Sequence, residues 1–467
     1  MKRLLLIVPD GVGVRNYLYS NFINELQSYN VEVVLYHQIS NAAIDEIKNI
    51  HPSICKIKAI PQFIEKPKAR LLRESTTYAR VLLNTRKLDN PTVMSFWNGN
   101  KKGFKQKMLN QLAEILGTVL SWNYNLILKM EALYDIEISK DTVFEKITHD
   151  IEQLQPDYIL NLHQRAPISA PIIAVAKMKK IRTATVIFSW DNVPKARLIS
   201  RYDEYLVWSD VMKSELSLLY PEIKSEQIKV VGTPQFEFYF DAKLILDKET
   251  FFAQYGLDST KKTVCYSAND ATSPYEANYL EDVCQAVSKM EESIRPQILF
   301  RRCPVDKSNR FDAVLKKYKG LIFSIDPDWR TEKGELETFS SIYPSYKDIS
   351  LLVNTVTHSD VVINFGSTMA HDFAVLNKPC LYLNYNPIDN SIFTVEMAYN
   401  FQHFRTMQGL EAVGWLNSSE EIGDKINLAL THPEKVGNDR KKWLEKIVQH
   451  PLEEASKNIA NVLLNPN

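Results

Sequence analysis

Residues 359–379 read SDVVINFGSTMAHDFAVLNKP and combine an apolar strand, a turn of small residues and the start of a helix. The helix opens at Gly366, Ser367 and Thr368. Backbone N–H groups at such an opening, together with two hydroxyls and the helix dipole, form an anion site suited to a diphosphate. Asp372 follows one helical turn later, where its carboxylate can accept hydrogen bonds from ribose hydroxyls. The stretch therefore predicts a nucleotide-binding turn.

A purely structural role for the same residues stays open. Ser367 or Thr368 could serve only to cap the helix, because hydroxyl side chains accept hydrogen bonds from the first free N–H groups of a helix. Asp372 could serve only to favour the first turns. The residues by themselves leave both interpretations standing.

The same order of strand, loop and helix recurs along most of the 467 residues. Residues 4–8, 158–162 and 204–208 are apolar strands, and a second series of strands begins at residue 263. Fully apolar strands that alternate with helices are typical of parallel sheets covered on both faces. A chain of this length exceeds what one core usually organises. We predict an α/β protein with two Rossmann-like parallel-sheet domains that face a central cleft.

Changes in composition place the domain boundaries. The N-terminal domain is predicted at 1–240, with a helix-rich insertion at about 65–150, and the C-terminal domain at 260–435. Helices at 436–467 are expected to pack back on the N-terminal domain. Within the insertion, residues 101–107 read KKGFKQK. This tract fits a solvated helix face, and attraction to anionic lipid or to a phosphate-bearing acceptor stays open.

The bulk composition excludes several classes of protein. Lys plus Arg and Asp plus Glu each number 56, so the chain lacks the cationic surplus that generic nucleic-acid binding needs. Five scattered cysteines without a CxxC pair predict neither a disulfide framework nor a zinc site. The N-terminal apolar run is too short for a signal peptide, and no later run has the length of a membrane span. We therefore expect a cytoplasmic protein, with a position at the inner face of a membrane left open.

A family resemblance narrows the prediction. Residues 367–379 resemble the donor-nucleotide motif of GT-B glycosyltransferases. They are especially similar to the motif of bacterial CDP-glycerol glycerophosphotransferases, which pairs two hydroxyl residues with a later Asp-Phe-Ala and a Lys-Pro. The order of strands and helices resembles these enzymes over most of the chain. The residues themselves resemble them in only a few short segments. It implies that Ser367 and Thr368 bind donor phosphates and that Asp372 binds the ribose.

Two more segments add donor-binding candidates. Residues 300–304 read FRRCP and resemble an Arg-x-His-Pro segment of the glycerophosphotransferases, with Cys303 in the place of the histidine. That replacement argues against polymerisation of glycerol phosphate. Arg301 or Arg302 can bind phosphate in a bidentate fork, although pairing with a carboxylate at the domain edge is the alternative. Ser267 and Asn269 occupy the loop that, by resemblance, faces the donor pyrophosphate.

The N-terminal domain is expected to hold the acceptor and the catalytic base. His163 ends one strand and Asp191 ends the next, so both are expected in one crevice. A histidine can take a proton from an acceptor hydroxyl near neutral pH. An aspartate could orient that imidazole or act as the base itself. Asp10, in the loop after the first strand, is a third catalytic candidate.

Acceptor-binding candidates lie beside these residues. Gly13 and Arg15 belong to the loop after the first strand, and Arg165 follows His163. Trp190 can stack on a sugar face, although a place in the core is the commoner use of tryptophan. No metal site is predicted, since the Pro in Asp326-Pro327-Asp328 favours a turn.

The combined prediction is a metal-independent glycosyltransferase of the GT-B type. It would move a sugar from a nucleotide-sugar donor to a hydroxyl of a saccharide or lipid-linked acceptor, with no cofactor besides the nucleotide-diphosphate sugar that is its substrate. By resemblance alone, the setting is bacterial surface polysaccharide synthesis, such as capsule formation. The alternatives are a CDP-alcohol phosphotransferase, a non-hydrolysing sugar epimerase, which shares the fold and needs no acceptor, and a catalytically inactive nucleotide-binding protein.

Overall fold

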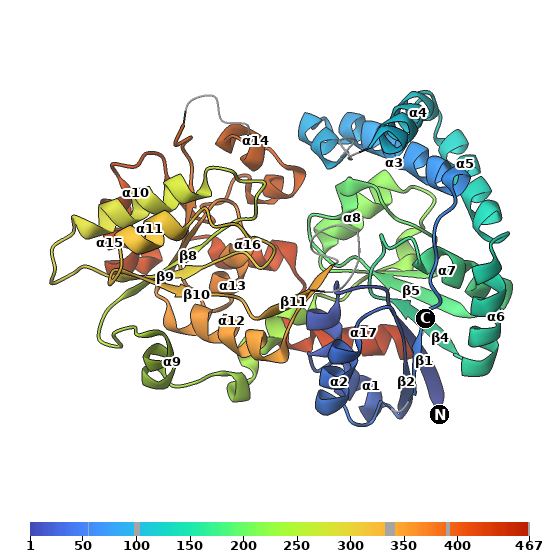
Figure 1. The fold of residues 1–467 in the computed structure, drawn as a ribbon, viewed down its shortest axis with the longest axis horizontal. Coiled ribbons are helices and arrows are strands. Elements are labelled where there is room, and N and C mark those ends of the chain that lie inside the picture. The colour runs from blue at the N-terminus through green and yellow to red at the C-terminus, as the bar shows by residue number, and fades with distance from the viewer. Residues whose placement is uncertain (55, 98–102, 332–340, 389–392, 466–467) are drawn as a thin grey trace.

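The structure is a computed structural model that describes the chain except residues 55, 98–102, 332–340, 389–392 and 466–467. Lys101 and Lys102 of the basic tract, and Cys55, lie outside the described residues. Two α/β domains lie side by side, each built on its own parallel sheet (Figure 1).

The N-terminal sheet has seven parallel strands in the order β3-β2-β1-β4-β5-β6-β7. Its inner strand β1 is apolar and buried from Leu4 onward, because helices cover both faces. The strands are β1 (Lys2–Val8), β2 (Val31–His37), β3 (Lys56–Ala59), β4 (Tyr158–Asn161), β5 (Arg182–Val186), β6 (Glu204–Val207) and β7 (Ile228–Val230).

The C-terminal sheet has six parallel strands in the order β10-β9-β8-β13-β14-β15. A separate antiparallel pair, β11 (Trp329–Thr331) and β12 (Ile342–Pro344), projects toward the N-terminal domain (Figure 1). The strands of the sheet are β8 (Thr263–Ser267), β9 (Gln297–Arg301), β10 (Ile322–Ile325), β13 (Val361–Asn364), β14 (Cys380–Leu383) and β15 (Gly414–Leu416). Two Rossmann-like domains confirm the predicted fold class.

Helices connect these strands, and several begin at the cap residues that the sequence supplies. The Ser40 and Ser345 hydroxyls accept hydrogen bonds from the N–H groups of Ala43 and Asp348, both at 3.3 Å. The N-terminal domain uses the π-helix η1 (Val14–Leu18), α1 (Phe22–Ser28), α2 (Asn41–Ile50), α7 (Ser169–Met178) and α8 (Asp210–Leu219). The C-terminal domain uses α9 (Lys248–Tyr255), α10 (Glu276–Ser288), α11 (Asp312–Lys317), α12 (Tyr346–His358), α13 (Met369–Val375), α14 (Val395–Tyr399) and α15 (Ile422–Thr431).

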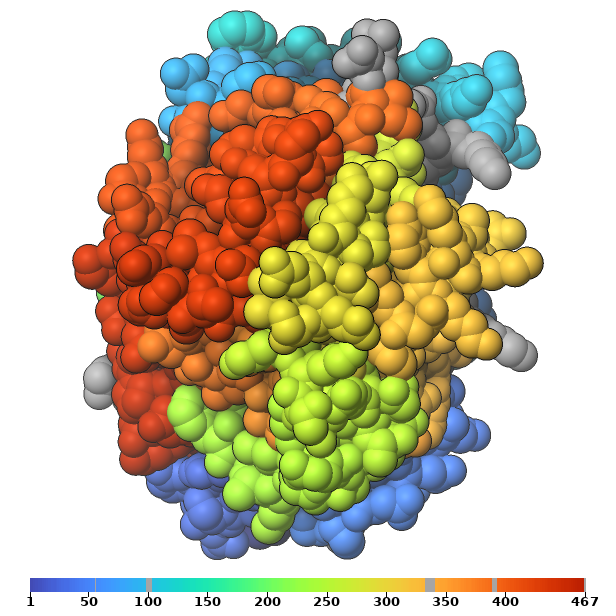
Figure 2. All heavy atoms as spheres, turned by 90° about the vertical axis from the view of Figure 1, so that its left-hand side faces the viewer, coloured from blue at the N-terminus to red at the C-terminus, as the bar shows by residue number. Residues whose placement is uncertain are grey.

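The outer face of the C-terminal domain carries α10 and α15, which Figure 2 presents to the viewer. An open groove of about 420 Å³ lies between these two helices. Its lining includes Asp282, Lys289, Glu420 and Asn427, and none of the predicted site residues.

Between β3 and β4 the chain forms a helical insertion, which Figure 1 shows along one side of the N-terminal domain. It comprises α3 (Pro67–Leu88), the short 3₁₀ helix η2 (Pro91–Phe96), α4 (Phe104–Leu120), α5 (Tyr124–Ile138) and α6 (Thr142–Leu154). Within the described part of the chain, no helix combines the length and apolarity needed to cross a bilayer.

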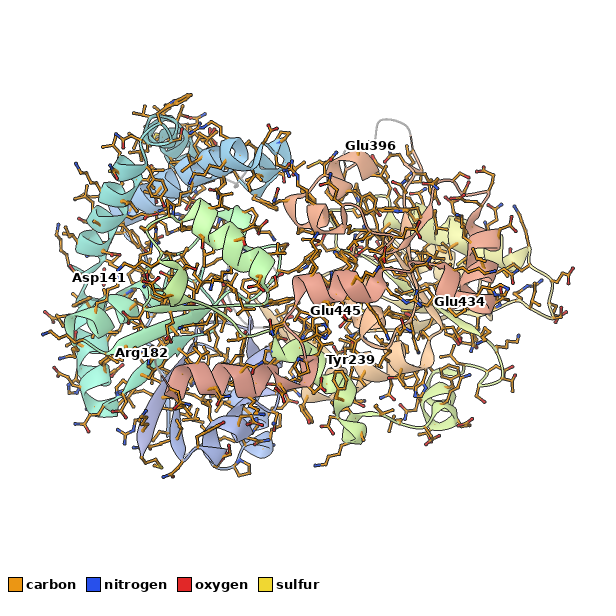
Figure 3. All side chains as sticks on the ribbon, turned by 180° about the vertical axis from the view of Figure 1, so that it is seen from behind. Asp141, Arg182, Tyr239, Glu396, Glu434 and Glu445 are labelled. Atoms are coloured by element: carbon orange, nitrogen blue, oxygen red, sulfur yellow. The ribbon has the colours of Figure 1, made fainter. Side chains whose placement is uncertain are left out.

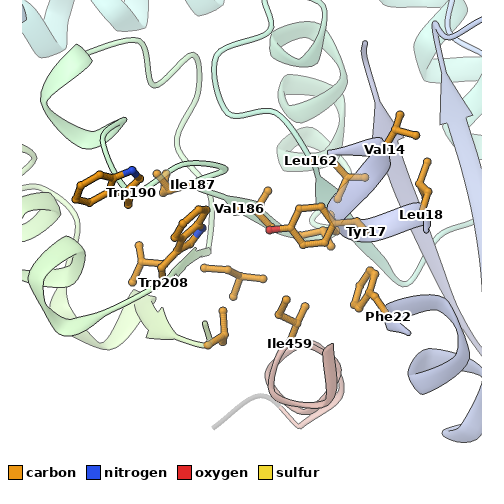
Figure 4. Close-up of a cluster of buried hydrophobic side chains, with 14 of the residues drawn as sticks. Val14, Tyr17, Leu18, Phe22, Leu162, Val186, Ile187, Trp190, Trp208 and Ile459 are labelled. Carbon is orange, nitrogen blue, oxygen red and sulfur yellow. The ribbon is translucent and has the colours of Figure 1, made fainter. Parts of the chain in front are cut away.

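The chain crosses between the domains twice. It leaves the N-terminal domain through the 3₁₀ helix η5 (Pro234–Phe240) and returns through α16 (Arg440–Ile447), which packs against both α13 and α8. The last helix, α17 (Ala455–Leu464), packs against α1, and Ile459 points toward Tyr17 and Phe22 (Figure 4). The C-terminal helix is therefore part of the N-terminal domain's core.

Candidate functional site

A histidine–aspartate pair lies at the carboxyl edge of the N-terminal sheet. Asp10 follows β1 and His163 follows the neighbouring strand β4, so parallel pairing brings the two side chains together. His163 Nδ1–H donates to Asp10 Oδ2 at 2.7 Å, and both side chains are buried. The other ring nitrogen, His163 Nε2, is buried and has no hydrogen-bond partner among the described residues. Because Nδ1 carries the proton, Nε2 presents a lone pair.

The second predicted carboxylate, Asp191, has other partners. Its oxygens accept hydrogen bonds from Lys195 Nζ and Ser189 Oγ, each at 2.6 Å. Burial alone would raise the pKa of Asp191, but Lys195 and His403 outweigh it and hold that pKa well below its usual range. The structure therefore brings His163 to Asp10 and Asp191 to Lys195, and a catalytic role for Asp191 stays a prediction.

The loop after β1 is shaped by Gly13. This residue has φ of +84°, and a Cβ there would lie 3.1 Å from Leu162 Cβ, so the turn favours glycine. Arg15 follows in η1, where its Nη2 donates to Gln235 Oε1 of η5 at 3.2 Å. Arg15 is half-buried and lies at the junction between the domains.

Asp372 of α13 faces the same junction. Its Oδ1 accepts a hydrogen bond of 2.8 Å from the hydroxyl of Tyr239, which lies between the two domains in Figure 3. Burial raises the pKa of Asp372, while the positive charges of Arg15 and Arg301 partly offset that effect. Two guanidinium groups from different domains thus act on one carboxylate. The predicted ribose ligand is, in this structure, hydrogen-bonded to a tyrosine of the connecting segment.

Arg301 and Arg302 point to different surroundings. Arg301 ends β9 and is buried, and its Nη2 donates to Asp348 at 2.9 and 3.1 Å. Its Nη1 is buried with no partner in the described part of the chain. Arg302 instead donates to the Ser308 carbonyl at 2.6 Å and lies over the Phe311 ring. Of these two arginines, Arg301 alone has a buried N–H group without a partner among the described residues, and this group could donate to an anion.

Packing and hydrogen bonds support the turn at Gly366. Gly366 has φ of +68°, and a Cβ there would lie 3.0 Å from the Phe404 ring. Asn269 Nδ2 donates to the Phe365 carbonyl at 2.5 Å, and Ser367 Oγ accepts from the Met369 N–H at 3.3 Å. The predicted donor-binding residues that remain are a buried Ser267 at the end of β8 and an exposed Thr368. Asn269 and Ser367 thus support the turn itself, and binding of phosphate there stays a prediction.

Trp190, the predicted acceptor-stacking residue, is buried in an aromatic cluster that joins the domains. Its ring packs edge-on against His371, His403 and Phe404 of the C-terminal domain and Trp443 of α16. Its side chain is 6% exposed, so a sugar could reach it only after the cluster opened.

His371 is a residue that the sequence did not single out. Both of its ring nitrogens are buried, with no hydrogen-bond partner among the residues that the structure describes. Burial, with a smaller contribution from His403, lowers the pKa of His371 to about 3, so the ring is neutral. The sequence carried no signal for this environment, because Trp190 and Trp443 come from distant segments.

Arg165 follows His163 in the loop after β4. Its Nη1 donates to Asn192 Oδ1 at 3.5 Å. Together with Gln164 it lines a cavity of about 10 Å³, the size of one water molecule. This space is too small for a sugar.

Contacts between the domains close both flanks of the junction. On one flank, Arg405 donates to the Leu88 and Asp89 carbonyls at 2.6 and 2.8 Å, and Phe96 stacks on Phe401. The opposite flank is closed where Glu46 of α2 accepts the Tyr346 N–H at 3.0 Å. The site is therefore walled by the insertion on one side and by α12 on the other.

Among the described residues, no group of three or more His, Cys, Asp and Glu side chains is arranged to hold a metal ion.

Two parallel-sheet domains with polar residues at their junction define a two-domain α/β architecture of the GT-B fold. No protein-family profile and no curated protein matches the chain. Solved structures do match it over almost its full length.

Three of these solved structures illustrate the similarity. UDP-GlcNAc 2-epimerase from Neisseria meningitidis, bound to UDP-GlcNAc, has a TM-score of 0.50 at 12% identity and covers 99% of both chains. UDP-GlcNAc 2-epimerase from Methanocaldococcus jannaschii has a TM-score of 0.52 at 13% identity and covers 96% of this chain and 98% of its own. A glycosyltransferase from Rickettsia africae has a TM-score of 0.51 at 12% identity and covers 100% and 99%.

At these identities the likeness establishes the fold. It supports the expected GT-B fold. It gives no support to the narrower resemblance to CDP-glycerol glycerophosphotransferases.

Proposed function

We propose that the chain is an enzyme that holds a nucleoside-diphosphate sugar between its domains and epimerises the sugar without hydrolysing it. The observation that carries the proposal is the buried dyad of Asp10 and His163. Its Nε2 has no partner among the described residues and can act as a base beside the loop that bears Arg15. Two of the similar structures are named UDP-GlcNAc 2-epimerases, and one of them holds UDP-GlcNAc, which supports the choice of ligand class.

The diphosphate would be bound by the two arginines that act on Asp372. Arg301 Nη1 is a buried donor with no partner in the described chain, and leaving such a donor unpaired is costly. A phosphate oxygen would satisfy it, because guanidinium–phosphate hydrogen bonds are charge-assisted. Arg15 would bind the same diphosphate from the other domain, so the ligand would link the domains.

His163 would move the proton. Epimerisation by proton transfer at the carbon next to the anomeric carbon needs a base to remove the hydrogen as a proton and an acid to return one to the opposite face. The electron pair of the broken C–H bond would form a C=C bond and expel the nucleoside diphosphate from the anomeric carbon, and re-addition of the diphosphate with the returned proton would restore the nucleotide sugar. Nε2 can accept the proton, and the Asp10 carboxylate then stabilises the imidazolium that forms.

The closed flanks favour a reaction of one substrate. Arg405 and Phe96 on one side and Glu46 on the other join the domains directly. A nucleotide sugar that reacts alone needs no path for a second, larger substrate. This feature supports the proposal of epimerisation over glycosyl transfer.

Glycosyl transfer is the second candidate, favoured by the similarity to the Rickettsia africae glycosyltransferase. In that reaction His163 would take the proton of an acceptor hydroxyl, and the nucleoside diphosphate would leave. The acceptor would be a saccharide or a lipid-linked sugar that enters after the domains separate.

The decisive experiment incubates the purified chain with UDP-, GDP-, CDP- and ADP-sugars in D₂O without an acceptor and follows the sugars by NMR. We expect one nucleotide sugar to be converted to its epimer with deuterium at the inverted carbon. Release of nucleoside diphosphate only when an acceptor is added would replace epimerisation by glycosyl transfer. Binding without any turnover would leave a nucleotide-binding protein.

A matched pair of variants tests the binding mode. Arg15→Met should weaken nucleotide binding by about tenfold or more, because it removes one charge-assisted contact. Arg302→Met is the control, since Arg302 binds the Ser308 carbonyl instead, and should leave affinity unchanged. Equal effects of the two substitutions would contradict the proposed diphosphate position.

A further inference from the structure

The helix α4 of the insertion exposes a row of large apolar side chains. Phe104 is 82% exposed, Ile115 64% and Val119 63%, and Trp122 just beyond the helix is 77% exposed. These positions recur at intervals of three or four residues and so share one face of the helix. The complete exposed set is Phe104, Met108, Leu112, Ile115, Leu116, Val119 and Trp122.

This arrangement is the reverse of an ordinary surface helix. Amphipathic helices of globular proteins normally bury their large apolar residues and expose polar ones. The buried face of α4 carries Asn110, Ala113, Gly117 and Leu120, of which Leu120 is the one large apolar residue. Gly117 sits so close to α3 that a Cβ would lie 2.7 Å from the Ser75 carbonyl oxygen. Small residues thus dock α4 firmly on α3 with its apolar face outward.

The charges around this face are positive. Lys105 and Lys107 are exposed at its N-terminal end, and at the other end the Arg86 guanidinium lies 4.6 Å from the centre of the Trp122 ring. Glu114 is the one acidic residue of α4, and it accepts a hydrogen bond from Trp97 Nε1 at 2.9 Å. The face therefore combines apolar side chains with cations at both ends.

We propose that this face of α4 binds the surface of a membrane that contains anionic lipid. Phe104, Ile115 and Trp122 would enter the boundary between headgroups and acyl chains, and the lysines would contact lipid phosphates. Figure 1 shows α4 at the periphery of the N-terminal domain, where a flat surface can reach it.

A second copy of the chain fits the same face less well. A two-fold contact would place this face against its own copy. The cations at its ends would then meet cations, and α4 offers no exposed carboxylate to pair with them. Charge complementarity therefore favours an anionic bilayer over self-association.

Vesicle flotation with the full-length chain tests the proposal. Vesicles of phosphatidylcholine alone are compared with vesicles that also contain phosphatidylglycerol. We expect at least about tenfold more protein on the anionic vesicles, and a decrease as salt is raised, because exposed charges are screened. Absence of binding to both vesicles overturns the proposal.

Matched variants distinguish binding through this face of α4 from unspecific adsorption of exposed apolar side chains. Phe104→Ser, Ile115→Ser and Trp122→Ser combined should abolish flotation without lowering the melting temperature, because all three side chains are exposed. The control combines Met178→Ser, Leu218→Ser and Ile294→Ser, which remove three apolar side chains exposed elsewhere, and should float as the parent does.

Two further results would decide against a membrane. Equal loss of flotation in the control variant would show that binding is unspecific. A concentration-dependent dimer in sedimentation velocity that the α4 substitutions abolish, with no flotation of the parent, would identify a second copy as the occupant. Lys105→Glu with Lys107→Glu should remove the preference for phosphatidylglycerol, and a retained preference would refute the role of charge.

Discussion

At the scale of single residues, the chemistry centres on His163. Its imidazole is held by Asp10 at 2.7 Å, and its Nε2 is buried without a partner in the described chain. Leaving a polar atom in that state costs free energy unless a ligand satisfies it. The cost is understandable where the atom has to accept a proton from a substrate.

The dyad leads to a first prediction. His163→Ala should lower turnover by about a hundredfold or more, because it removes the general base, while nucleotide affinity should stay within about threefold. Asp10→Asn should also lower turnover, because an amide cannot stabilise the imidazolium. Steady-state kinetics and nucleotide titration measure the two effects. A His163→Ala variant with parental turnover would exclude the base role.

A second prediction concerns Glu215 of α8, which accepts a hydrogen bond of 3.1 Å from Gln402 across the domain junction. Burial raises its pKa to about 7 from the ordinary 4.5, with a smaller contribution from the charge of Asp191. Between these two pKa values the folded chain holds a proton that the unfolded chain has released. The free energy of unfolding therefore falls as pH rises through this window, and the loss is complete above it.

Glu215→Gln should remove that dependence, because an amide carries no titrating proton. Below about pH 4.5 the variant and the parent should have the same melting temperature. Above about pH 7 the free energy of unfolding of the variant should be higher by on the order of 1 kcal/mol. Thermal melts across this range measure the difference. Parallel curves for the two proteins would show that other groups cause the pH dependence.

At the scale of elements, close approach of helices depends on where glycine stands. Gly117 lets α4 approach α3, since a Cβ would lie 2.7 Å from the Ser75 carbonyl oxygen. Gly423 in α15 has its nearest neighbouring atom at 3.9 Å and serves no such contact.

The two glycines therefore predict opposite effects of alanine. Gly117→Ala should lower the free energy of unfolding by about 1 to 3 kcal/mol, because α4 must move away from α3. Gly423→Ala should be neutral or raise it by up to about 1 kcal/mol, because alanine favours the helix. Urea unfolding measures both. Stabilisation by Gly117→Ala would contradict the described packing of α4.

At the scale of the whole molecule, Trp190 is one of the residues that join the two domains. Its ring contacts His371, His403 and Phe404 in the C-terminal domain and Trp443 in the returning helix α16. The connecting segment adds the hydrogen bond from Tyr239 to Asp372. Opening of the cleft would therefore require this cluster to separate.

Trp190→Ala should lower the free energy of unfolding by about 3 to 5 kcal/mol, because it leaves a cavity between the domains. Calorimetry should then show two separated transitions in place of one, since the domains lose an apolar contact that joins them. Trp122→Ala is the control, because Trp122 is 77% exposed, and it should change stability by less than about 0.5 kcal/mol. A single transition for Trp190→Ala at the melting temperature of the parent would contradict the coupling of the two domains through Trp190.

The alternation of apolar strands with helices was enough to predict both parallel sheets, because strand burial and helix periodicity are written in neighbouring residues. The same patterns placed His163 and Asp10 at strand ends. The hydrogen-bond partners of the polar side chains could not be predicted in this way. Asp191 was expected beside His163 and pairs with Lys195, and Asp372 contacts Tyr239 from a segment 133 residues away.

The sequence by itself determined the two-sheet fold and the positions of the candidate site residues along the strands, because these depend on local patterns of burial. Tertiary structure alone decided that Asp10 holds His163, that Trp190 is buried between the domains and that Arg302 points away from Arg301. Such contacts join segments far apart in the chain, so they depend on how strands are ordered and how the domains are placed. No pattern of neighbouring residues carries that information.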